Sequence, residues 1–257
     1  MTQRLINLNA DLGESFGAWQ MGDDSALLQI VSSANLACGF HAGDPLIMRH
    51  TVRLALAQGV SIGAHPSFPD LQGFGRRAMQ LSPAELEATI LYQVGALQAM
   101  ATAEGGRVSH VKPHGALNNI ACADAAVAAT VARAVRSLDP ALILLAPAHS
   151  ELARAGEAAG LPVRYEVFAD RAYLDDGQLM PRSRPGAVLH DAEQCVEHVL
   201  AMLREQAIVA ASGHRLPTRI DSICVHGDGP EAVATARLIR QALEQADYRL
   251  AALDRMG

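Results

Sequence analysis

The sequence predicts an α/β fold, a seven-stranded parallel (β/α) barrel formed as one domain over residues 1–257. Short apolar strands alternate with helical stretches along the chain, which is typical of βα units around a parallel sheet. Polar residues follow the ends of these strands, where parallel α/β folds place their binding and catalytic groups. A chain of 257 residues is long enough for one such barrel.

Seven apolar runs are expected to form the strands. They cover residues 5–10, 33–38, 60–64, 108–112, 141–146, 163–168 and 221–226. Periodicity alone does not separate a closed barrel from an open, doubly wound sheet. The first run continues as NADLGESFG, which has acids and amides where a dinucleotide-binding turn would have GxGxxG. We therefore favour the barrel.

The helices are marked by side chains that can cap free backbone amides. Asp44 stands directly before Pro45, which suits the first turn of a helix. Ser82, Pro83 and Glu85 combine a capping box with proline at the first helical position. Further helices are expected to start at Asp191 and at Gly229 with Pro230, and to cover residues near 116–137 and 150–159.

Composition and charge exclude several classes of protein. The net charge is −6 and there is no basic block, so nucleic acid is not expected as a partner. No apolar run approaches the roughly 20 residues that span a bilayer, so no membrane helix is expected. Residues 1–15 lack the basic and apolar parts of a secretory signal, and we expect a cytoplasmic protein.

Titratable and amide side chains gather just after the strand ends. Catalytic roles are expected for Asp11, His41, His65, Lys112, His114, His226 and Asp228. Substrate-binding roles are expected for Asn9, Glu14, Asp170, Arg171 and Arg184. One histidine at a strand end would indicate little, whereas imidazole, carboxylate and ammonium groups from six strand ends are difficult to assign to packing.

Lys112 is the only lysine, because the other 20 of the 21 basic residues are arginine. It ends the fourth predicted strand, and His114 follows it closely. Arginine does not replace lysine where a compact point charge or a removable proton is needed. We expect an electrostatic role for Lys112, facing His65 and His226. The alternatives are an accident of composition, or an ammonium that only holds a carboxylate such as Asp11 in place.

Simpler explanations stay open for some of these residues. Asn7 and Asn9 alternate along the first strand, so both could fill a polar barrel interior. Asp44 is better explained as a helix cap than as a catalyst.

A divalent metal is an alternative use of three side chains. Asp11, His41 and His65 combine the carboxylate and imidazole ligands that suit zinc, manganese or iron. No HExxH or HxxxH element accompanies them, so the spacing does not establish a tightly bound metal.

Arginines in two irregular segments could bind an anion. Residues 170–188 carry Arg171, Arg182 and Arg184, which could hold a carboxylate or phosphate, or could belong to a solvated loop. The run GFGRR at 73–77 has the same two interpretations. Neither segment matches the GxxxxGK[ST] phosphate loop.

Seven runs together resemble the LamB/YcsF family, in order, from about residue 5 to 245. They are NADLGESFG, ANLACGFHAGDP, IGAHPSFPD, GFGRR, VKPHGALNN, FADRAY and VHGDGP. The resemblance implies a seven-stranded barrel related to glycoside hydrolases and polysaccharide deacetylases. It also implies the A subunit of a 5-oxoprolinase, which with the B and C subunits hydrolyses 5-oxo-L-proline to L-glutamate while ATP gives ADP and phosphate.

The implied reaction needs a cation, a base and a clamp for the substrate carboxylate. Lys112 is expected as the cation, His65, His114 or Asp11 as the base, and Arg171 or Arg184 as the clamp. ATP, with Mg²⁺, is expected as a co-substrate, but the sequence does not indicate which subunit binds it. Self-association stays open.

Two rival functions fit the same residues. One is a metal-dependent deacetylase or carbohydrate hydrolase on this barrel, with Asp11, His41 and His65 as ligands. The other is a non-enzymatic lactam- or carbohydrate-binding protein, although so many titratable groups together favour catalysis.

Overall fold

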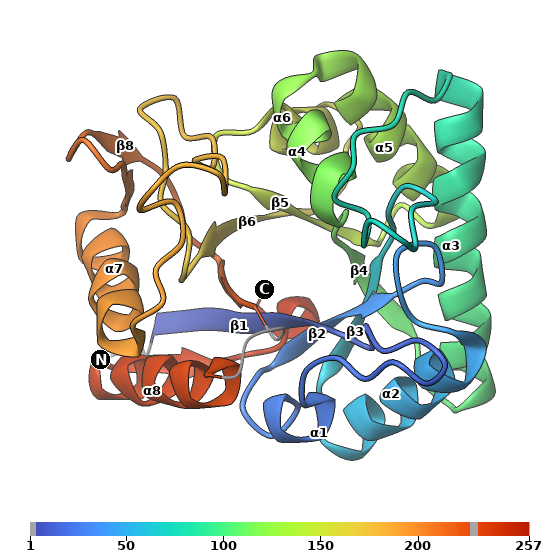
Figure 1. The fold of residues 1–257 in the computed structure, drawn as a ribbon, viewed down its shortest axis with the longest axis horizontal. Coiled ribbons are helices and arrows are strands. Elements are labelled where there is room, and N and C mark those ends of the chain that lie inside the picture. Colours follow the sequence, from blue (N-terminus) through green and yellow to red (C-terminus); the bar gives the residue numbers. More distant parts are fainter. Residues whose placement is uncertain (1–3, 227–230, 257) are drawn as a thin grey trace.

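The computed structural model describes residues 4–226 and 231–256, and within them seven parallel strands close into a barrel (Figure 1). In ring order the strands are β1 (Arg4–Leu12), β2 (Ser33–Ala37), β3 (Ser61–His65), β4 (Val108–Val111), β5 (Ile143–Pro147), β6 (Val163–Phe168) and β9 (Ser222–Val225). The ring closes because β9 also pairs with β1, from Asn7 opposite Ser222 to Ala10 opposite Val225. The predicted barrel is confirmed.

Helices surround the ring of strands in Figure 1. They are α1 (Asp24–Leu27), α2 (Pro45–Ala57), α3 (Pro83–Ala103), α4 (Gly115–Ala123), α5 (Ala125–Leu138), α6 (Glu151–Ala158), α7 (Ala192–Glu205) and α8 (Ala232–Gln245), with a short 3-10 helix at Leu253–Arg255. Within the described ranges, no single helix is long and apolar enough to cross a membrane.

The predicted helix starts are confirmed where the structure describes them. Asp44 accepts hydrogen bonds from the first turn of α2, and Asp191 caps α7 in the same way. Ser82 and Glu85 form both halves of the capping box of α3. The start predicted at Gly229 and Pro230 lies outside the described residues. The helix predicted near 116–137 is two helices, because Asp124 ends α4 and its side chain caps α5.

Three short strands are absent from the sequence prediction. The strand β10 (Tyr248–Leu250) pairs in parallel with the start of β1. The strands β7 (Ala207–Val209) and β8 (Arg215–Pro217) form an antiparallel pair after α7. Each has three residues, too few for an alternating pattern to stand out in the sequence.

The interior of the barrel is polar and is connected by hydrogen bonds. Asn9 donates to Glu166 Oε1 at 2.9 Å and to Ser222 Oγ at 2.8 Å. Asn35 donates to Asn9 Oδ1 at 2.7 Å, and His110 Nε2 lies 3.0 Å from Asn35 Oδ1. All five side chains are buried. Asn9 therefore supports the barrel from inside, which agrees with the simpler of its two interpretations.

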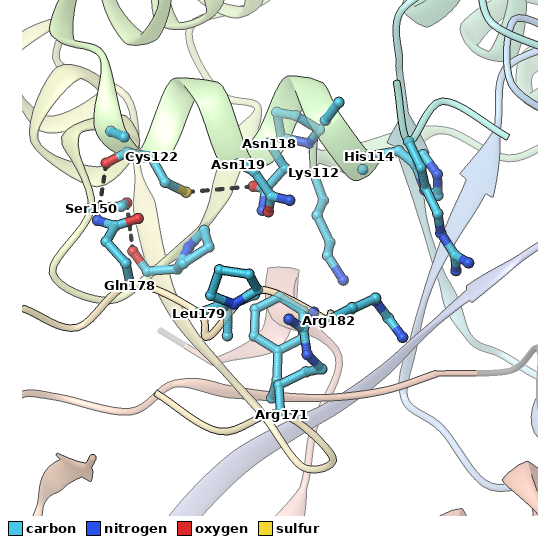
Figure 2. A pocket seen from close by; sticks show the side chains of 18 of the residues that line it. Lys112, His114, Asn118, Asn119, Cys122, Ser150, Arg171, Gln178, Leu179 and Arg182 are labelled. Carbon is cyan, nitrogen blue, oxygen red and sulfur yellow. Dashed lines mark hydrogen bonds between the residues drawn. The ribbon is translucent and has the colours of Figure 1, made fainter. Parts of the chain in front are cut away.

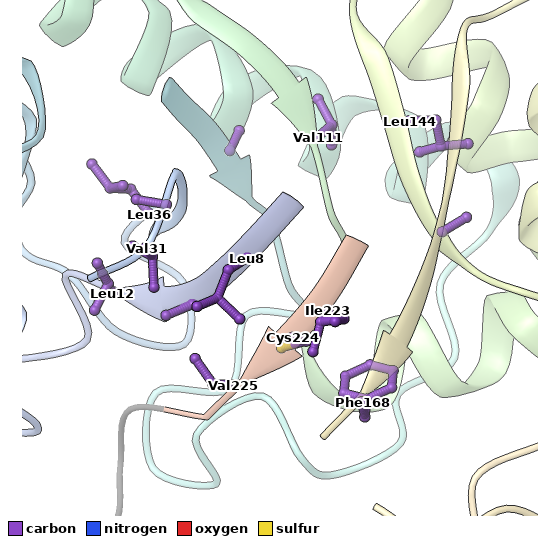
Figure 3. Close-up of a cluster of buried hydrophobic side chains, with 14 of the residues drawn as sticks. Leu8, Leu12, Val31, Leu36, Val111, Leu144, Phe168, Ile223, Cys224 and Val225 are labelled. Carbon is purple, nitrogen blue, oxygen red and sulfur yellow. The ribbon is translucent and has the colours of Figure 1, made fainter. Parts of the chain in front are cut away.

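Most apolar side chains of the strands gather in one buried cluster, while Ile143 and Leu145 of β5 pack with Leu253. Figure 3 shows part of it, including Leu8, Leu36, Val111, Leu144 and Ile223. In β1 the buried apolar residues alternate with the buried polar ones, so one face of the strand packs against the helices while the other fills the barrel. The polar interior thus lies within an apolar shell.

We predict that Gly63→Ala destabilises the barrel. Gly63 in β3 is paired with His110 in β4, and a methyl group there would overlap the His110 ring, which also contacts Asn35. The free energy of unfolding, measured by urea denaturation, should fall by about 1–3 kcal/mol.

Gly95→Ala is the matched control. Gly95 lies within α3, and a methyl group there meets nothing within 4 Å. This variant should gain about 0.5–1 kcal/mol, because alanine favours a helix over glycine. Equal stability of the two variants would contradict the packing described for Gly63.

Candidate functional site

A cavity of about 690 Å³ opens at the carboxyl ends of the barrel strands. Figure 2 shows Lys112 pointing into it near His114, with Arg171 and Arg182 opposite. The wall combines strand ends with α4 and parts of two long connections, residues 66–82 and 169–191. The two segments whose arginines the sequence analysis singled out, 73–77 and 170–188, lie within these connections.

The first connection packs over the histidines at the cavity wall. Gly75 adopts φ +63° and its carbonyl accepts a hydrogen bond from Ala116 at the start of α4. A side chain at Gly75 would collide with Ser67 and come within 2.8 Å of His114. The run GFGRR is therefore a tight covering turn, and its Arg76 lines the cavity.

The second connection is held together by Arg171. Its guanidinium donates to the main-chain carbonyl of Met180 at 2.7 Å and to that of Ala187 at 3.3 Å. Arg171 and Arg182 both line the cavity, whereas Arg184 is exposed and lies outside its lining. Of the predicted clamp residues, Arg171 thus has hydrogen bonds to its own loop. Arg182, an exposed arginine of the same segment, stands at the cavity wall.

Lys112 forms an ion-pair network inside the barrel. Its ammonium lies 3.0 Å from Asp11 Oδ1 and 3.2 Å from Glu166 Oε1, and it also contacts Cys224 Sγ at 3.0 Å. Burial lowers the pKa of Lys112, but these neighbours outweigh burial and hold that pKa well above its usual value. These contacts agree with the alternative that Lys112 holds Asp11 in place. They agree less well with the expectation that Lys112 faces His65 and His226.

Asp11 is the carboxylate that this network presents to the cavity. Burial alone would raise its pKa, but His65 and Lys112 hold the pKa of Asp11 well below the usual range. Oδ2 lies 3.2 Å from His65 Nε2, and Oδ1 accepts a hydrogen bond from Asn35 at 2.9 Å. Asp11 is thus an ionised, rigidly held acceptor. Glu166 differs, because burial raises its pKa more than Lys112 lowers it.

Three histidines and Glu14 form a cluster beside Asp11. His65 Nε2 and His114 Nδ1 lie 2.9 Å apart, and His41 stacks on His114 with ring centroids separated by 3.8 Å. Glu14 Oε1 lies 3.1 Å from His41 Nε2 and 3.5 Å from His114 Nδ1. Burial lowers the pKa of both His41 and His114, so these rings are neutral at pH 7.

These four residues could hold a metal ion. One ligand atom from each lies within 4.8 Å of all the others. The sequence indicated Asp11, His41 and His65 as possible ligands, so the structure retains the two histidines and adds Glu14 and His114. Glu14 therefore belongs to the histidine cluster more than to a substrate clamp.

His226 and Asp170 form a second pair at the cavity. His226 Nδ1 donates to the Asp170 carboxylate at 2.7 Å. Burial lowers the pKa of His226, but Asp170 outweighs burial and raises it above the usual value. The pKa of Asp170 is lowered because His226 outweighs its own burial. His226 lines the cavity while Asp170 lies behind it. Asp228 lies outside the described residues.

Most of the predicted site residues converge, and one contributor was missed. The cavity lining includes Asp11, Glu14, His65, Lys112, His114, Arg171 and His226. His41 joins the cluster behind this lining, and Asn9 lies deeper in the barrel. Glu166 was missed, although an acid inside the apolar run VRYEVF is a signal that could have identified it.

The fold is a β/α barrel whose architecture is shared with a deacetylase. A peptidoglycan N-acetylglucosamine deacetylase from Eubacterium rectale matches with a TM-score of 0.54 at 11% identity, over 99% of this chain and 90% of that one. At this identity the likeness concerns the fold alone.

The LamB/YcsF family model matches residues 6–257. The A subunit of a 5-oxoprolinase from Azoarcus sp. strain BH72 is 63% identical over 252 residues, which cover 98% of each chain. A lactam utilization protein from Thermus thermophilus superposes with a TM-score of 0.91 at 48% identity, over 96% of this chain and 99% of that one. The chain belongs to the LamB/YcsF family.

We predict that Asp170→Asn lowers the pKa of His226. The ionised Asp170 favours the imidazolium, so this pair stabilises the fold fully below the ordinary histidine pKa of 6.5. That contribution is lost as the pH rises through the raised pKa of folded His226. NMR titration of the His226 ring, assigned with a His226→Gln spectrum, measures the change. An unaltered titration in Asp170→Asn would rule out this pairing.

We also predict that Lys112→Met destabilises the protein by about 3–5 kcal/mol, because it leaves buried carboxylates without their cation. Urea denaturation measures the loss. In an Asp11→Asn background the same substitution should cost less, since one of the two carboxylates is already neutral. An equal cost in both backgrounds would contradict the Lys112–Asp11 coupling.

Proposed function

We propose that this chain is the A subunit of an ATP-dependent 5-oxoprolinase. With the B and C subunits it hydrolyses 5-oxo-L-proline to L-glutamate while ATP and water give ADP and phosphate. The proposal is supported by the relatives that are named as the A subunit of 5-oxoprolinase. The observation that carries it is the pairing of an ionised Asp11 with a proton-bearing His226 on one cavity.

The chemistry explains why both groups are needed. A five-membered lactam is a stable amide, and phosphorylation of its carbonyl oxygen by ATP makes the ring carbon open to attack by water. Ring opening then needs a group that orients the water and a group that protonates the departing nitrogen. An acceptor and a donor on the same cavity supply this pair.

Asp11 is assigned the orientation of the water. Its low pKa makes it a weak base, so it acts mainly by accepting a hydrogen bond in a fixed direction. Lys112 is a positioning residue in this assignment, because its ammonium is held between Asp11 and Glu166. His226, with its raised pKa and its carboxylate partner Asp170, is assigned the proton that the nitrogen receives.

The substrate carboxylate is assigned to the arginines on the cavity wall. Arg182 and Arg76 both line the cavity, and a guanidinium suits a carboxylate. This assignment replaces Arg184 with Arg182 and leaves Arg171 to shape the loop. ATP, with Mg²⁺, enters as the co-substrate of the complex of all three subunits, which we place in the cytoplasm.

A metal-dependent hydrolase or deacetylase is the second candidate function. It is favoured by one observation, the cluster of Glu14, His41, His65 and His114. Release of acetate from acetylated sugars by this chain alone, with no requirement for ATP or partner chains, would distinguish it from a component of a 5-oxoprolinase.

Reconstitution with the B and C subunits tests the proposal. ADP and glutamate should form from 5-oxoproline in equal amounts, and only when all three subunits are present. His226→Gln in this chain should lower kcat by about 10²–10⁴-fold, the usual contribution of a positioned acid. Coupled assays for ADP and glutamate measure both.

His50→Gln provides the matched control. His50 is an exposed residue of α2, and its replacement should leave the rate unchanged. Failure of the three subunits to form glutamate would refute the proposed function. Full activity of His226→Gln would refute the role given to His226 while leaving the overall reaction standing.

A further inference from the structure

His65 and His114 each direct one ring nitrogen at a main-chain oxygen and the other at the neighbouring ring. His65 Nδ1 lies 2.6 Å from the main-chain oxygen of Lys112, and His114 Nε2 lies 2.8 Å from that of Phe74. A carbonyl oxygen only accepts, so each ring directs its N–H there. The other two nitrogens, His65 Nε2 and His114 Nδ1, lie 2.9 Å apart and are the atoms of these rings left to bind a ligand.

Carboxylate oxygens lie close to the same two ring nitrogens. Glu14 Oε1 lies 3.5 Å from His114 Nδ1, and Asp11 Oδ2 lies 3.2 Å from His65 Nε2. His41 points Nε2 at Glu14, and its Nδ1 is buried without a hydrogen-bond partner among the described residues. Carboxylate oxygens and ring nitrogens that converge in a buried space form a donor set suited to a cation, beside the Lys112 ammonium that pairs with Asp11.

We propose that Glu14, His41, His65 and His114 bind one divalent transition-metal ion at the wall of the cavity. Three imidazoles and one carboxylate are the ligands that zinc and its neighbours prefer over magnesium or calcium. In a tetrahedral zinc site, ligand atoms at the usual bond lengths lie about 3.4 Å apart. Three of the separations in the cluster are 2.9, 3.1 and 3.5 Å, and every ligand atom lies within 4.8 Å of the others.

The surroundings are those of a metal centre and not only of a hydrogen-bond network. Histidine ligands commonly donate their second N–H to a carbonyl, which fixes the ring and the lone pair, and both His65 and His114 do so. Glu14, His65 and His114 all reach the cavity surface, so an ion there faces a bound substrate.

This inference deepens the proposed function and rests on it for the identity of the substrate. A cation beside Asp11 would act as a Lewis acid on the phosphoryl oxygens carried by the activated lactam, stabilising the charge that leaves with phosphate when water attacks the ring carbon. The site would then contain both a metal and the ionised Asp11, with the His226 ring within 4.8 Å of Asp11.

Metal binding by the full chain tests the proposal directly. The protein is stripped with a chelator, dialysed against Zn²⁺ and analysed for metal content by mass spectrometry. We expect one zinc per chain, with Mg²⁺ unable to displace it. His114→Gln and Glu14→Gln should each weaken zinc binding by about 100-fold or more, while His50→Gln should bind as the unaltered chain does.

Each outcome has a definite meaning. Circular dichroism establishes that the variants fold. Two different ligands are replaced, so that the test can still be made if one of the two variants does not fold. Absence of zinc binding, or binding undiminished in both folded variants, overturns the proposal. If the three subunits form glutamate while the chelated chain binds no zinc, this inference fails and the proposed function stands. If zinc binds as expected but no glutamate forms, the proposed function fails and the metal site stands.

Discussion

The ion pair between Lys112 and Asp11 is the constraint on which the rest of the site depends. A charge buried this deeply is stable only when it is paired, and Lys112 is paired with Asp11 and Glu166 together. The main chain of the same residue also acts on the site, because the carbonyl of Lys112 fixes the ring of His65. One position at the end of β4 therefore orients both a carboxylate and an imidazole.

The layers of the barrel keep the Lys112–Asp11 ion pair in place. Asn9 and Asn35 connect Glu166 and Asp11 to the strand backbones, and an apolar shell separates this polar interior from solvent. Two long connections then close over the strand ends. Gly75 lets one of them approach His114, and Arg171 fixes the other through main-chain carbonyls. The cavity is a product of these contacts and not of the strands alone.

The sequence predicted the barrel and much of the site for a physical reason. Parallel strands all end on one side, so Asp11, His65 and Lys112 meet without any knowledge of the packing between them. Two features were harder to predict, namely which face of a strand a given side chain occupies and which path a long loop follows. Glu166 points inward from a strand read as apolar, and Arg182 reaches the cavity while Arg184 does not, because hydrogen bonds inside the loop decide its path. Likewise, no spacing in the sequence brings Glu14 to His114.

Anomalous diffraction from crystals grown with zinc tests the central claim most directly, namely that the strand ends assemble a cation site next to the Lys112–Asp11 pair. Data collected on both sides of the zinc absorption edge locate bound zinc without reference to activity. The account predicts one strong peak among Glu14, His41, His65 and His114. A map with no peak there, or with zinc only at exposed surface residues, would contradict it.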